Sequence, residues 1–201
     1  MNLHQQFGDI DIYLFDQLLK GRIRQGDRIL DAGCGGGRNL VYLLRSGADI
    51  WGSDGDGDAV TEARRLAAAL APGLPPDRFT VSPLESLTFP DGHFTVVICS
   101  AVLHFARNDA QFEAMLKSIW RVLAPGGMLF CRLASSEGIR DQVRPEQGGR
   151  YVLPDGTTRY LVSESGLRRW TDVLGGKLLD PLKTTIVHGQ RSMTTWILRK
   201  D

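Results

Sequence analysis

The sequence predicts an α/β fold, a doubly wound and mostly parallel sheet with helices on both faces and a small hairpin insert. Short apolar runs alternate with segments whose apolar residues recur at helical spacing, and this alternation repeats about four times. The run Phe94–Cys99 (FTVVIC) is apolar throughout, as expected for a strand covered on both faces. The 201 residues are 42% hydrophobic and 23% charged, which is ordinary globular usage and excludes disorder, collagen or coiled coil as whole-chain descriptions.

The first two thirds of the chain carry the parallel part of the predicted sheet. We expect strands at 28–31, 48–53, 78–81, 94–99 and 128–133. Helical stripes fall at 10–20, 38–45, 59–70 and 112–123. Asp56 or Asp58 is placed to cap the third of these helices, and Asn108 with Gln111 resembles a capping box before the fourth. The segment PGG at 125–127 ends that helix.

The last third of the chain shows a different pattern. Two short apolar segments, 150–153 and 158–162, flank Pro-Asp-Gly and predict a hairpin. A helix is expected at 167–174, ended by two glycines, and strands at 178–187 and 192–198 should pair antiparallel. Because no linker, repeat or low-complexity segment interrupts the chain, we expect a single domain over 1–201, with an N-terminal cap helix in 1–22 and an insert or lid at 135–163.

Charge and cysteine usage narrow the expected partners and compartment. Lys+Arg 24 against Asp+Glu 23 gives a net charge of +1, without the basic excess typical of a nucleic-acid partner. No apolar run is long enough to predict a membrane partner, and the N-terminus lacks a signal-peptide pattern. The three cysteines form no CxxC pair, which favours reduced thiols and a cytoplasmic location. We expect a small-molecule substrate and a monomer or homodimer.

A glycine-rich loop is the strongest functional signal. The 23 glycines exceed the roughly 14 expected from average usage, and several fall in RILDAGCGGGRN at 28–39, between the first strand and its helix. Open α/β sheets bind ligands at this edge. Gly33 and Gly35 let backbone touch a ligand, and Asp54, ending the second strand, suits two ribose hydroxyls.

The residue types of this loop discriminate between two nucleotide cofactors. A dinucleotide fingerprint needs a small residue where this chain has Arg38 or Leu40. The Asp31 carboxylate would repel a pyrophosphate, but it suits an ammonium group. An amino-acid nucleoside such as S-adenosylmethionine, which has an ammonium, a ribose and an adenine, fits this pattern better.

Four segments in order strengthen this interpretation. RILDAGCGGGRN, IWGSDGD, LESLTFPDGHFTVVICSAVLHF and IWRVLAPGGMLF resemble the successive motifs of class I S-adenosylmethionine-dependent methyltransferases, across residues 28–133. GCGGGRN also resembles the tellurite-resistance/thiopurine-type branch, which acts on small molecules. The resemblance implies a Rossmann-like, seven-stranded sheet of order 3-2-1-4-5-7-6 with strand 7 antiparallel.

The resemblance also implies roles for particular residues in binding S-adenosylmethionine and its product S-adenosylhomocysteine. Asp31 would lie near the methionine ammonium and Asp54 would accept from the ribose. The remaining predicted cofactor-binding residues are Gly33, Cys34 and Gly35 around the methionine part, Gly55, Leu84 and Glu85 on the adenine side, Ser100 near the sulfonium and methionine, and Arg38 at the end of the glycine loop.

Two residues depart from the family pattern, and both fall on the adenine half. Pro83 stands where the family often has an aspartate that accepts from the adenine amino group. Gly55 stands where a large apolar residue often backs the adenine. Ser82, Glu85 and Trp51 are the candidates to compensate. These departures keep open the alternative of a nucleoside-binding domain without turnover.

The segment after the fourth strand is the expected place for reaction chemistry. It reads CSAVLHF at 99–105 instead of the Asn/Asp-Pro-Pro-aromatic motif of enzymes that methylate base amino groups. His104 is a candidate base for a thiol or phenol, with a packed or cofactor-adjacent histidine as the alternative. Arg107 is a candidate anion holder, or simply precedes a helix, and Tyr13 is a candidate pocket residue from the cap helix, or core. No cluster has metal-ligand spacing, so we expect no metal.

The sequence therefore favours a methyltransferase that acts on a small-molecule nucleophile by in-line displacement. The protein would position a thiol, oxygen, amine or soft oxyanion against the methyl group and exclude water. Two alternatives stay open at this point: a catalytically inactive S-adenosylmethionine- or nucleoside-binding regulatory domain, and a methyltransferase that acts on protein or RNA.

Overall fold

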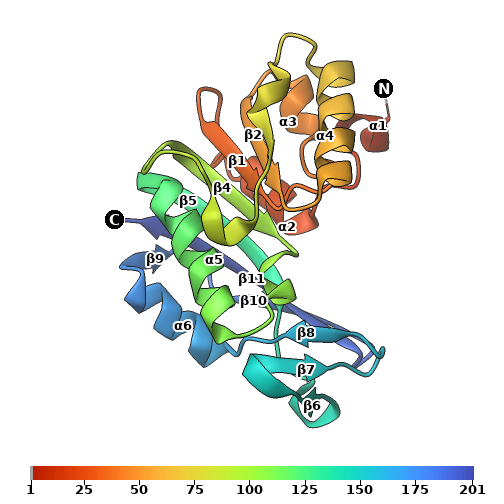
Figure 1. Ribbon diagram of the computed structural model, residues 1–201, viewed down its shortest axis with the longest axis vertical. Helices are drawn as coiled ribbons and strands as arrows, with labels where there is room; N and C mark the ends of the chain where they lie inside the picture. The colour runs from red at the N-terminus through yellow and green to blue at the C-terminus, as the bar shows by residue number, and fades with distance from the viewer. Residues whose placement is uncertain (1) are drawn as a thin grey trace.

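The computed structural model describes residues 2–201 and is organised around one large, mostly parallel sheet (Figure 1). Its strands lie in the order β10-β11-β5-β4-β1-β2-β3, and β9 also pairs with β11. Their bounds are β1 Arg28–Ala32, β2 Asp49–Asp54, β3 Phe79–Val81, β4 Phe94–Ser100, β5 Leu123–Ala134, β9 Gly176–Leu178, β10 Lys183–Val187 and β11 Arg191–Lys200. β11 is antiparallel to β5, β9 and β10, whereas β1 to β5 are mutually parallel, so the order implied by the family resemblance is confirmed.

Helices cover both faces of the sheet because alternate strand residues point to opposite sides. The helices are α1 Leu3–Phe7, α2 Ile12–Leu19, α3 Val41–Arg45, α4 Gly57–Leu70, α5 Asp109–Val122 and α6 Glu164–Val173. Ile29 and Ile98 pack into the core under α2, α3 and α4, while their neighbours Leu30 and Cys99 pack into the core under α5 and α6. The two-sided burial explains the continuous apolar run of β4.

The two expected turn-and-cap features take specific forms. Asp56 caps α4 by accepting from the Asp58 amide. Asn108 caps α5 by accepting from the Gln111 amide, but the reciprocal half of a capping box is absent from this helix start, because the Gln111 side chain accepts from the Arg107 amide instead.

The insert after β5 forms a small antiparallel sheet of its own at one end of the molecule (Figure 1). Its strands are β6 Arg144–Pro145, β7 Arg150–Val152 and β8 Thr158–Tyr160, so the predicted hairpin is confirmed and β6 is added to it. Tyr160 joins the insert to α5, because its ring stacks on Phe112 with centroids 4.6 Å apart and its hydroxyl donates to Asp109 at 2.8 Å.

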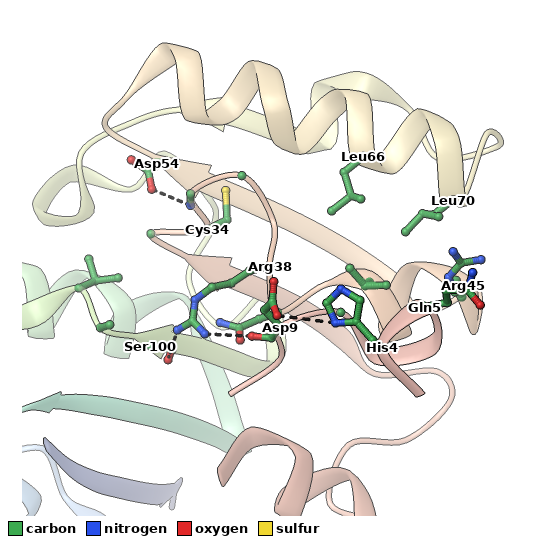
Figure 2. A pocket seen from close by; sticks show the side chains of 18 of the residues that line it. His4, Gln5, Asp9, Cys34, Arg38, Arg45, Asp54, Leu66, Leu70 and Ser100 are labelled. Carbon is green, nitrogen blue, oxygen red and sulfur yellow. Dashed lines mark hydrogen bonds and ion pairs between the residues drawn. The ribbon is translucent and has the colours of Figure 1, made fainter. Parts of the chain in front are cut away.

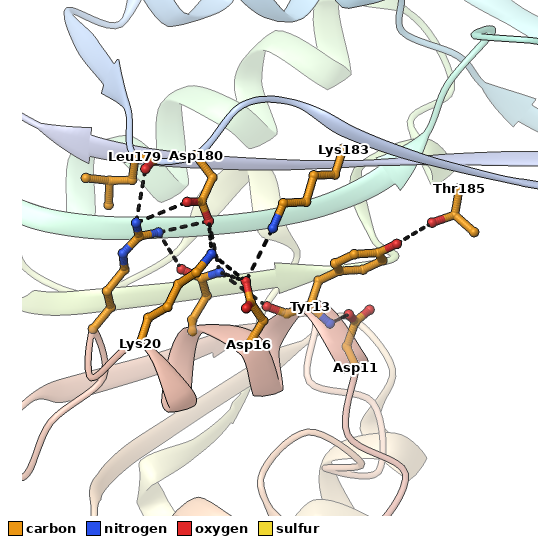
Figure 3. Close-up of polar contacts among 10 residues, drawn as sticks. Asp11, Tyr13, Asp16, Lys20, Leu179, Asp180, Lys183 and Thr185 are labelled. Carbon is orange, nitrogen blue, oxygen red and sulfur yellow. Dashed lines mark hydrogen bonds and ion pairs between the residues drawn. The ribbon is translucent and has the colours of Figure 1, made fainter.

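The expectation of one continuous strand over 178–187 is wrong. The chain forms β9 and then β10, and Asp180-Pro181 lies between them. Proline has no amide hydrogen to donate to a ladder. The Asp180 carboxylate accepts from Arg22 and Lys20 near the C-terminal end of α2, which draws this stretch toward the N-terminal helix (Figure 3).

The N-terminal segment lies against the antiparallel end of the sheet and is held there by polar contacts (Figure 3). It contains two helices, α1 and α2, rather than one. Lys20 and Lys183 both donate to Asp16, and the Tyr13 hydroxyl forms a hydrogen bond of 2.7 Å with Thr185 of β10. α2 is therefore fixed beside the carboxyl ends of the central strands.

Candidate functional site

The glycine loop between β1 and α3 is shaped by close packing on both sides. The Gly33 and Cys34 amides donate to the Ser53 carbonyl at 2.7 and 3.0 Å. Gly33 has φ +81°, and a Cβ there would overlap the Val102 side chain. Gly35 has φ +51°, but a Cβ there would meet only open space. Glycine at 33 thus permits a close approach of backbone, while Gly35 faces a cavity.

A cavity of about 860 Å³ opens over this loop, at the carboxyl ends of the strands (Figure 2). We call it the glycine-loop cavity. Six of the ten predicted cofactor-binding residues line it: Gly33, Cys34, Gly35, Arg38, Asp54 and Ser100. α1, α3, α4 and the segment after β4 supply most of its other walls.

Asp54 connects the second strand to the glycine loop. Its Oδ2 accepts from the Gly35 amide at 2.9 Å, and its Oδ1 accepts from the Asp56 amide at 3.0 Å (Figure 2). Each carboxylate oxygen has a further lone pair, so both can still accept from a ligand hydroxyl. Asp54 can therefore hold the loop and bind a diol at once.

Asp31 is a buried carboxyl group without a partner. Its side chain is 1% exposed, and neither oxygen has a hydrogen-bond donor among the residues that the structure describes. Burial raises the pKa of Asp31 to about 7, the nearby Asp54 acts in the same direction, and Arg38 opposes them. Burying a carboxylate without a hydrogen-bond donor costs free energy, so a cation such as an ammonium group bound beside Asp31 would stabilise its ionised form.

A series of polar contacts connects the lining of the glycine-loop cavity with Arg132. Arg38 donates to the Ser100 hydroxyl at 3.2 Å (Figure 2). Ser100 in turn donates to the Asp11 carboxylate at 3.1 Å. Asp11 also accepts from Arg132 at 3.0 Å, and its side chain is fully buried. Sequence reasoning missed Asp11, although an aspartate before an apolar helical stripe is a recognisable N-cap, which it is for α2.

The other predicted cofactor-binding residues are Cys34, whose thiol is buried, and the residues that lie outside the cavity lining. Burial, with the Asp31 and Asp54 carboxylates nearby, raises the pKa of the Cys34 thiol, so its thiolate is not formed near neutral pH. Asp31, Gly55, Leu84 and Glu85 do not line the glycine-loop cavity. Leu84 is buried in the core under α5, and Glu85 accepts from the Gln111 side chain at 2.8 Å.

A second cavity of about 390 Å³ adjoins the first. It is lined by Ala101, His104, Arg132, Ala134, Leu153, Asp155, Thr157, Arg159, Thr185, Val187, Arg191, Ser192 and Met193. The segment after β4, the insert and the β10–β11 hairpin thus build its walls. Ala101 lines both cavities and has φ +65°, an unfavourable backbone conformation for a residue with a Cβ.

His104 lies in the wall of the second cavity as a neutral, partly packed side chain. Its Nδ1 accepts from the Ala134 amide at 3.2 Å. Burial, with the nearby Arg159 charge, lowers the pKa of His104 to about 4. In a neutral imidazole only one nitrogen accepts, so the proton is on Nε2 and the ring offers a donor rather than a base.

Arg107 and Tyr13 differ in whether they contact residues that line a cavity. Arg107 is exposed, donates to Gln111 and lines neither cavity. Tyr13 is half-buried, its hydroxyl bonds Thr185 of the second cavity, and Arg132 lies over its ring at 5.4 Å. Neither residue lines a cavity, but Tyr13 contacts two residues that line the second one, Thr185 and Arg132.

Residues 2–201 contain neither a metal-binding cluster nor a membrane-spanning helix. No group of three or more His, Cys, Asp or Glu side chains in this range could hold a metal ion. None of the helices described has both the length and the apolar character needed to cross a membrane.

Comparison with known proteins agrees with this geometry. Residues 30–131, just over half of the chain, match the profile of a family described as a methyltransferase domain. The chain belongs to the methyltransferase domain family. A solved SAM-dependent methyltransferase from Methanosarcina mazei shares the fold of this methyltransferase domain, with a TM-score of 0.72, 20% identity, and coverage of 91% of this chain and 96% of its own.

Two curated relatives of this methyltransferase domain are longer proteins. An uncharacterized methyltransferase from Synechocystis is 34% identical over 106 residues, which are 53% of this chain and 46% of the relative. A tRNA U34 carboxymethyltransferase from Idiomarina loihiensis is 30% identical over 176 residues, which are 86% of this chain and 52% of the relative. The chain thus spans about half the length of these relatives.

Proposed function

We propose that this protein transfers a methyl group from S-adenosylmethionine to a small-molecule nucleophile, a thiol, oxygen, amine or soft oxyanion. The observation that carries the proposal is the meeting of two cavities at Ala101, one over the glycine loop and one beneath the insert. A donor and an acceptor bound in neighbouring cavities can be held at reacting distance, which converts their encounter into a positioned reaction.

The residues of the glycine-loop cavity suit the methionine and ribose parts of the cofactor. In its lining, Asp54 offers accepting lone pairs and Gly35 leaves space for close approach. Asp31 lies outside the lining, two residues before Gly33 in the chain, and offers a buried carboxyl group without a partner. When bound, S-adenosylmethionine supplies a methyl group on a sulfonium sulfur, which keeps the electron pair of the broken bond. The adenine contacts expected from Gly55, Leu84 and Glu85 lie outside this cavity and stay predictions.

The chain contributes orientation and exclusion of water more than proton transfer. The Nδ1 of His104 is engaged by the Ala134 amide and its pKa is lowered, so the packed alternative for His104 fits better than a general base. A base is needed only when the acceptor arrives protonated. Because His104 lines the second cavity and its Nδ1 is used by Ala134, its proposed role is to donate from Nε2 to an acceptor and orient it.

The size of the second cavity favours a small molecule over a polymer. Its volume of about 390 Å³ falls within the usual range of roughly 300–1,000 Å³ for small-ligand sites. Because one relative is a tRNA U34 carboxymethyltransferase, RNA is included as an alternative acceptor in the test. The net charge of +1 disfavours it, since RNA-binding proteins usually have an excess of basic residues.

The test has a binding arm and a turnover arm. Calorimetry should show S-adenosylhomocysteine binding, and labelled S-adenosylmethionine should transfer its methyl group to at least one member of a panel of thiols, phenols, amines and oxyanions. No binding at millimolar ligand would overturn the cofactor assignment. Binding without any transfer would support the regulatory-domain alternative, and transfer only to tRNA or protein would replace the small-molecule proposal.

A further inference from the structure

The second cavity holds more basic than acidic side chains. Three arginines and one carboxylate, Asp155, are among its lining residues. Arg191 is neutralised by Asp155, with Nε and Oδ2 2.6 Å apart, and Arg132 pairs with the buried Asp11. The third, Arg159, forms no ion pair within residues 2–201, so the cavity keeps an uncompensated positive charge.

Arg159 is held in place while most of its donors stay free. Its Nη1 donates to the Thr158 carbonyl at 2.8 Å, and its guanidinium lies over the Phe105 ring, 4.9 Å from the centroid. An arginine has five N–H donors, and those not used by Thr158 are available to a ligand. Phe105 itself lines the glycine-loop cavity, so this guanidinium lies at the boundary between the two cavities.

A second unfilled donor belongs to the same wall. Arg132 also lines this cavity: its Nη1 binds Asp11, its Nε is buried, and its Nη2 forms no hydrogen bond in the described part of the chain. A planar guanidinium binds carboxylates and other oxyanions through pairs of N–H groups. The cavity therefore presents unfilled donors from two arginines.

The other lining groups neither cancel this charge nor compete for it. The nearby Arg159 charge and burial keep His104 neutral near pH 7, and Thr157, Thr185 and Ser192 add hydroxyl groups. Leu153 and Met193 give the cavity an apolar side that suits a hydrocarbon body.

On these observations we infer that the methyl acceptor is an organic anion whose carboxylate or other oxyanion is bound by Arg159 and Arg132. The inference rests on the methyltransferase function proposed above and narrows its acceptor class. The anionic group fixes one end of the acceptor, and its nucleophilic atom then faces Ala101, where the two cavities meet. Neutral thiols, phenols and amines without an anionic group are poor acceptors on this basis.

The experiment compares acids with their uncharged amides on the protein loaded with S-adenosylhomocysteine. The probes are 3-mercaptopropionate, 4-hydroxybenzoate and 4-aminobenzoate, each beside its primary amide. Binding is measured by calorimetry and thermal shift, and turnover by label transfer from S-adenosylmethionine. We expect at least one acid to bind and its amide to bind about 10- to 100-fold more weakly, the loss of one or two charge-assisted hydrogen bonds.

Variants assign the effect to the arginine. Arg159→Gln should weaken acid binding about 10- to 100-fold and remove the acid-over-amide preference, with affinity for S-adenosylhomocysteine unchanged. Arg159→Lys keeps the charge and should retain part of the preference. Arg65→Gln, on the exposed side of α4, is the matched control and should behave as the wild type. Melting curves of each variant confirm that it is folded.

The outcomes separate this inference from the proposed function. Equal binding of acids and amides, no binding of any acid, or an Arg159→Gln protein with undiminished preference would each overturn the anionic acceptor. In those cases, intact S-adenosylhomocysteine binding and transfer to a neutral acceptor would leave the methyltransferase proposal standing. A wild-type protein that does not bind S-adenosylhomocysteine would overturn the cofactor assignment first.

Discussion

At the scale of single residues, the buried carboxyl group of Asp31 makes the stability of the fold depend on pH. The ordinary carboxyl pKa of 3.8 is raised to about 7 in the folded protein, so between these pH values the folded state holds a proton that the unfolded state has lost. The free energy of unfolding therefore falls as pH rises through this window, because the folded state binds more protons. The loss is at most about 4 kcal/mol, from 1.36 kcal/mol for each pKa unit.

Asp31→Asn should raise the stability of the ligand-free protein at high pH and weaken cofactor binding. The amide cannot ionise, so we expect the ligand-free variant to unfold at higher urea than the wild type at pH 8, and the difference to shrink toward pH 4. Affinity for S-adenosylhomocysteine should fall, because the ligand ammonium loses its carboxylate partner. Urea unfolding at several pH values and calorimetry measure the two effects.

Proton release gives a more specific readout of the same residue. An ammonium beside Asp31 favours the ionised carboxylate, so binding at pH 6 should release protons, which calorimetry detects when buffers of different ionisation enthalpy are compared. The Asp31→Asn protein should release none from this site. Equal release by wild type and variant would show that the ammonium does not bind beside Asp31.

The sequence could predict only part of the site at this scale. Gly33, Asp54 and Ser100 lie at or just after strand ends, and all three line one cavity. Leu84 and Glu85 do not, because Leu84 packs into the core and Glu85 bonds Gln111, contacts made across distant parts of the chain. The sequence could not predict that Arg159 keeps free donors, because its position over the Phe105 ring is a contact between distant parts of the chain.

At the scale of elements, the glycine loop combines two kinds of glycine. Gly33 packs against the segment after β4, whereas Gly35 faces the cavity. Both have positive φ, which costs a residue with a Cβ roughly 1–2 kcal/mol. Packing should therefore separate the effects of the same substitution at the two positions.

Gly33→Ala should destabilise the protein by about 2–5 kcal/mol, the sum of backbone strain and overpacking against Val102. Gly35→Ala should cost only about 1–2 kcal/mol of stability but should weaken S-adenosylhomocysteine binding, because its Cβ enters the cavity. Urea unfolding and calorimetry on both variants test this. Equal losses of stability would contradict the different packing assigned to the two glycines.

Element boundaries were predicted best where burial alone decides them. The strands β1 to β4 follow from apolar runs within one residue of their observed bounds. The strand predicted at 128–133 begins earlier, at Leu123, so the segment 125–127 lies inside β5 and the helix before it ends at Val122. The division of 178–187 into β9 and β10 depends on Arg22 and Lys20 binding Asp180, a contact made from the other end of the chain. β6 has two residues, too few to show an alternating pattern.

At the scale of the whole molecule, the ends of the chain and the insert are each tied to the central sheet. Asp180 binds the end of α2, and Tyr160 binds α5. The strand order followed from the family resemblance. The position of the second cavity did not, because it depends on where the insert meets the β10–β11 hairpin.

These contacts predict that the chain unfolds as one cooperative unit, as a single domain should. Trp120, Trp170 and Trp196 all lie in or against the core under α5 and α6, so their fluorescence reports one face of the sheet. Far-UV circular dichroism reports both faces. We expect coincident urea transitions by the two probes, and Asp180→Asn should shift both together to lower urea. Separate midpoints would indicate more than one unit.

Asp11 has a consequence for how strongly the binding of one ligand affects the binding of the other. One oxygen of this carboxylate accepts from Ser100, at the glycine-loop cavity, and from Arg132, at the second cavity. A ligand that draws either donor toward itself changes the hold of Asp11 on the other. Such coupling is reciprocal, so the factor by which a cofactor alters acceptor affinity equals the factor by which the acceptor alters cofactor affinity. A single side chain thereby connects the two adjoining cavities, so that cofactor and acceptor can bind cooperatively without a moving domain.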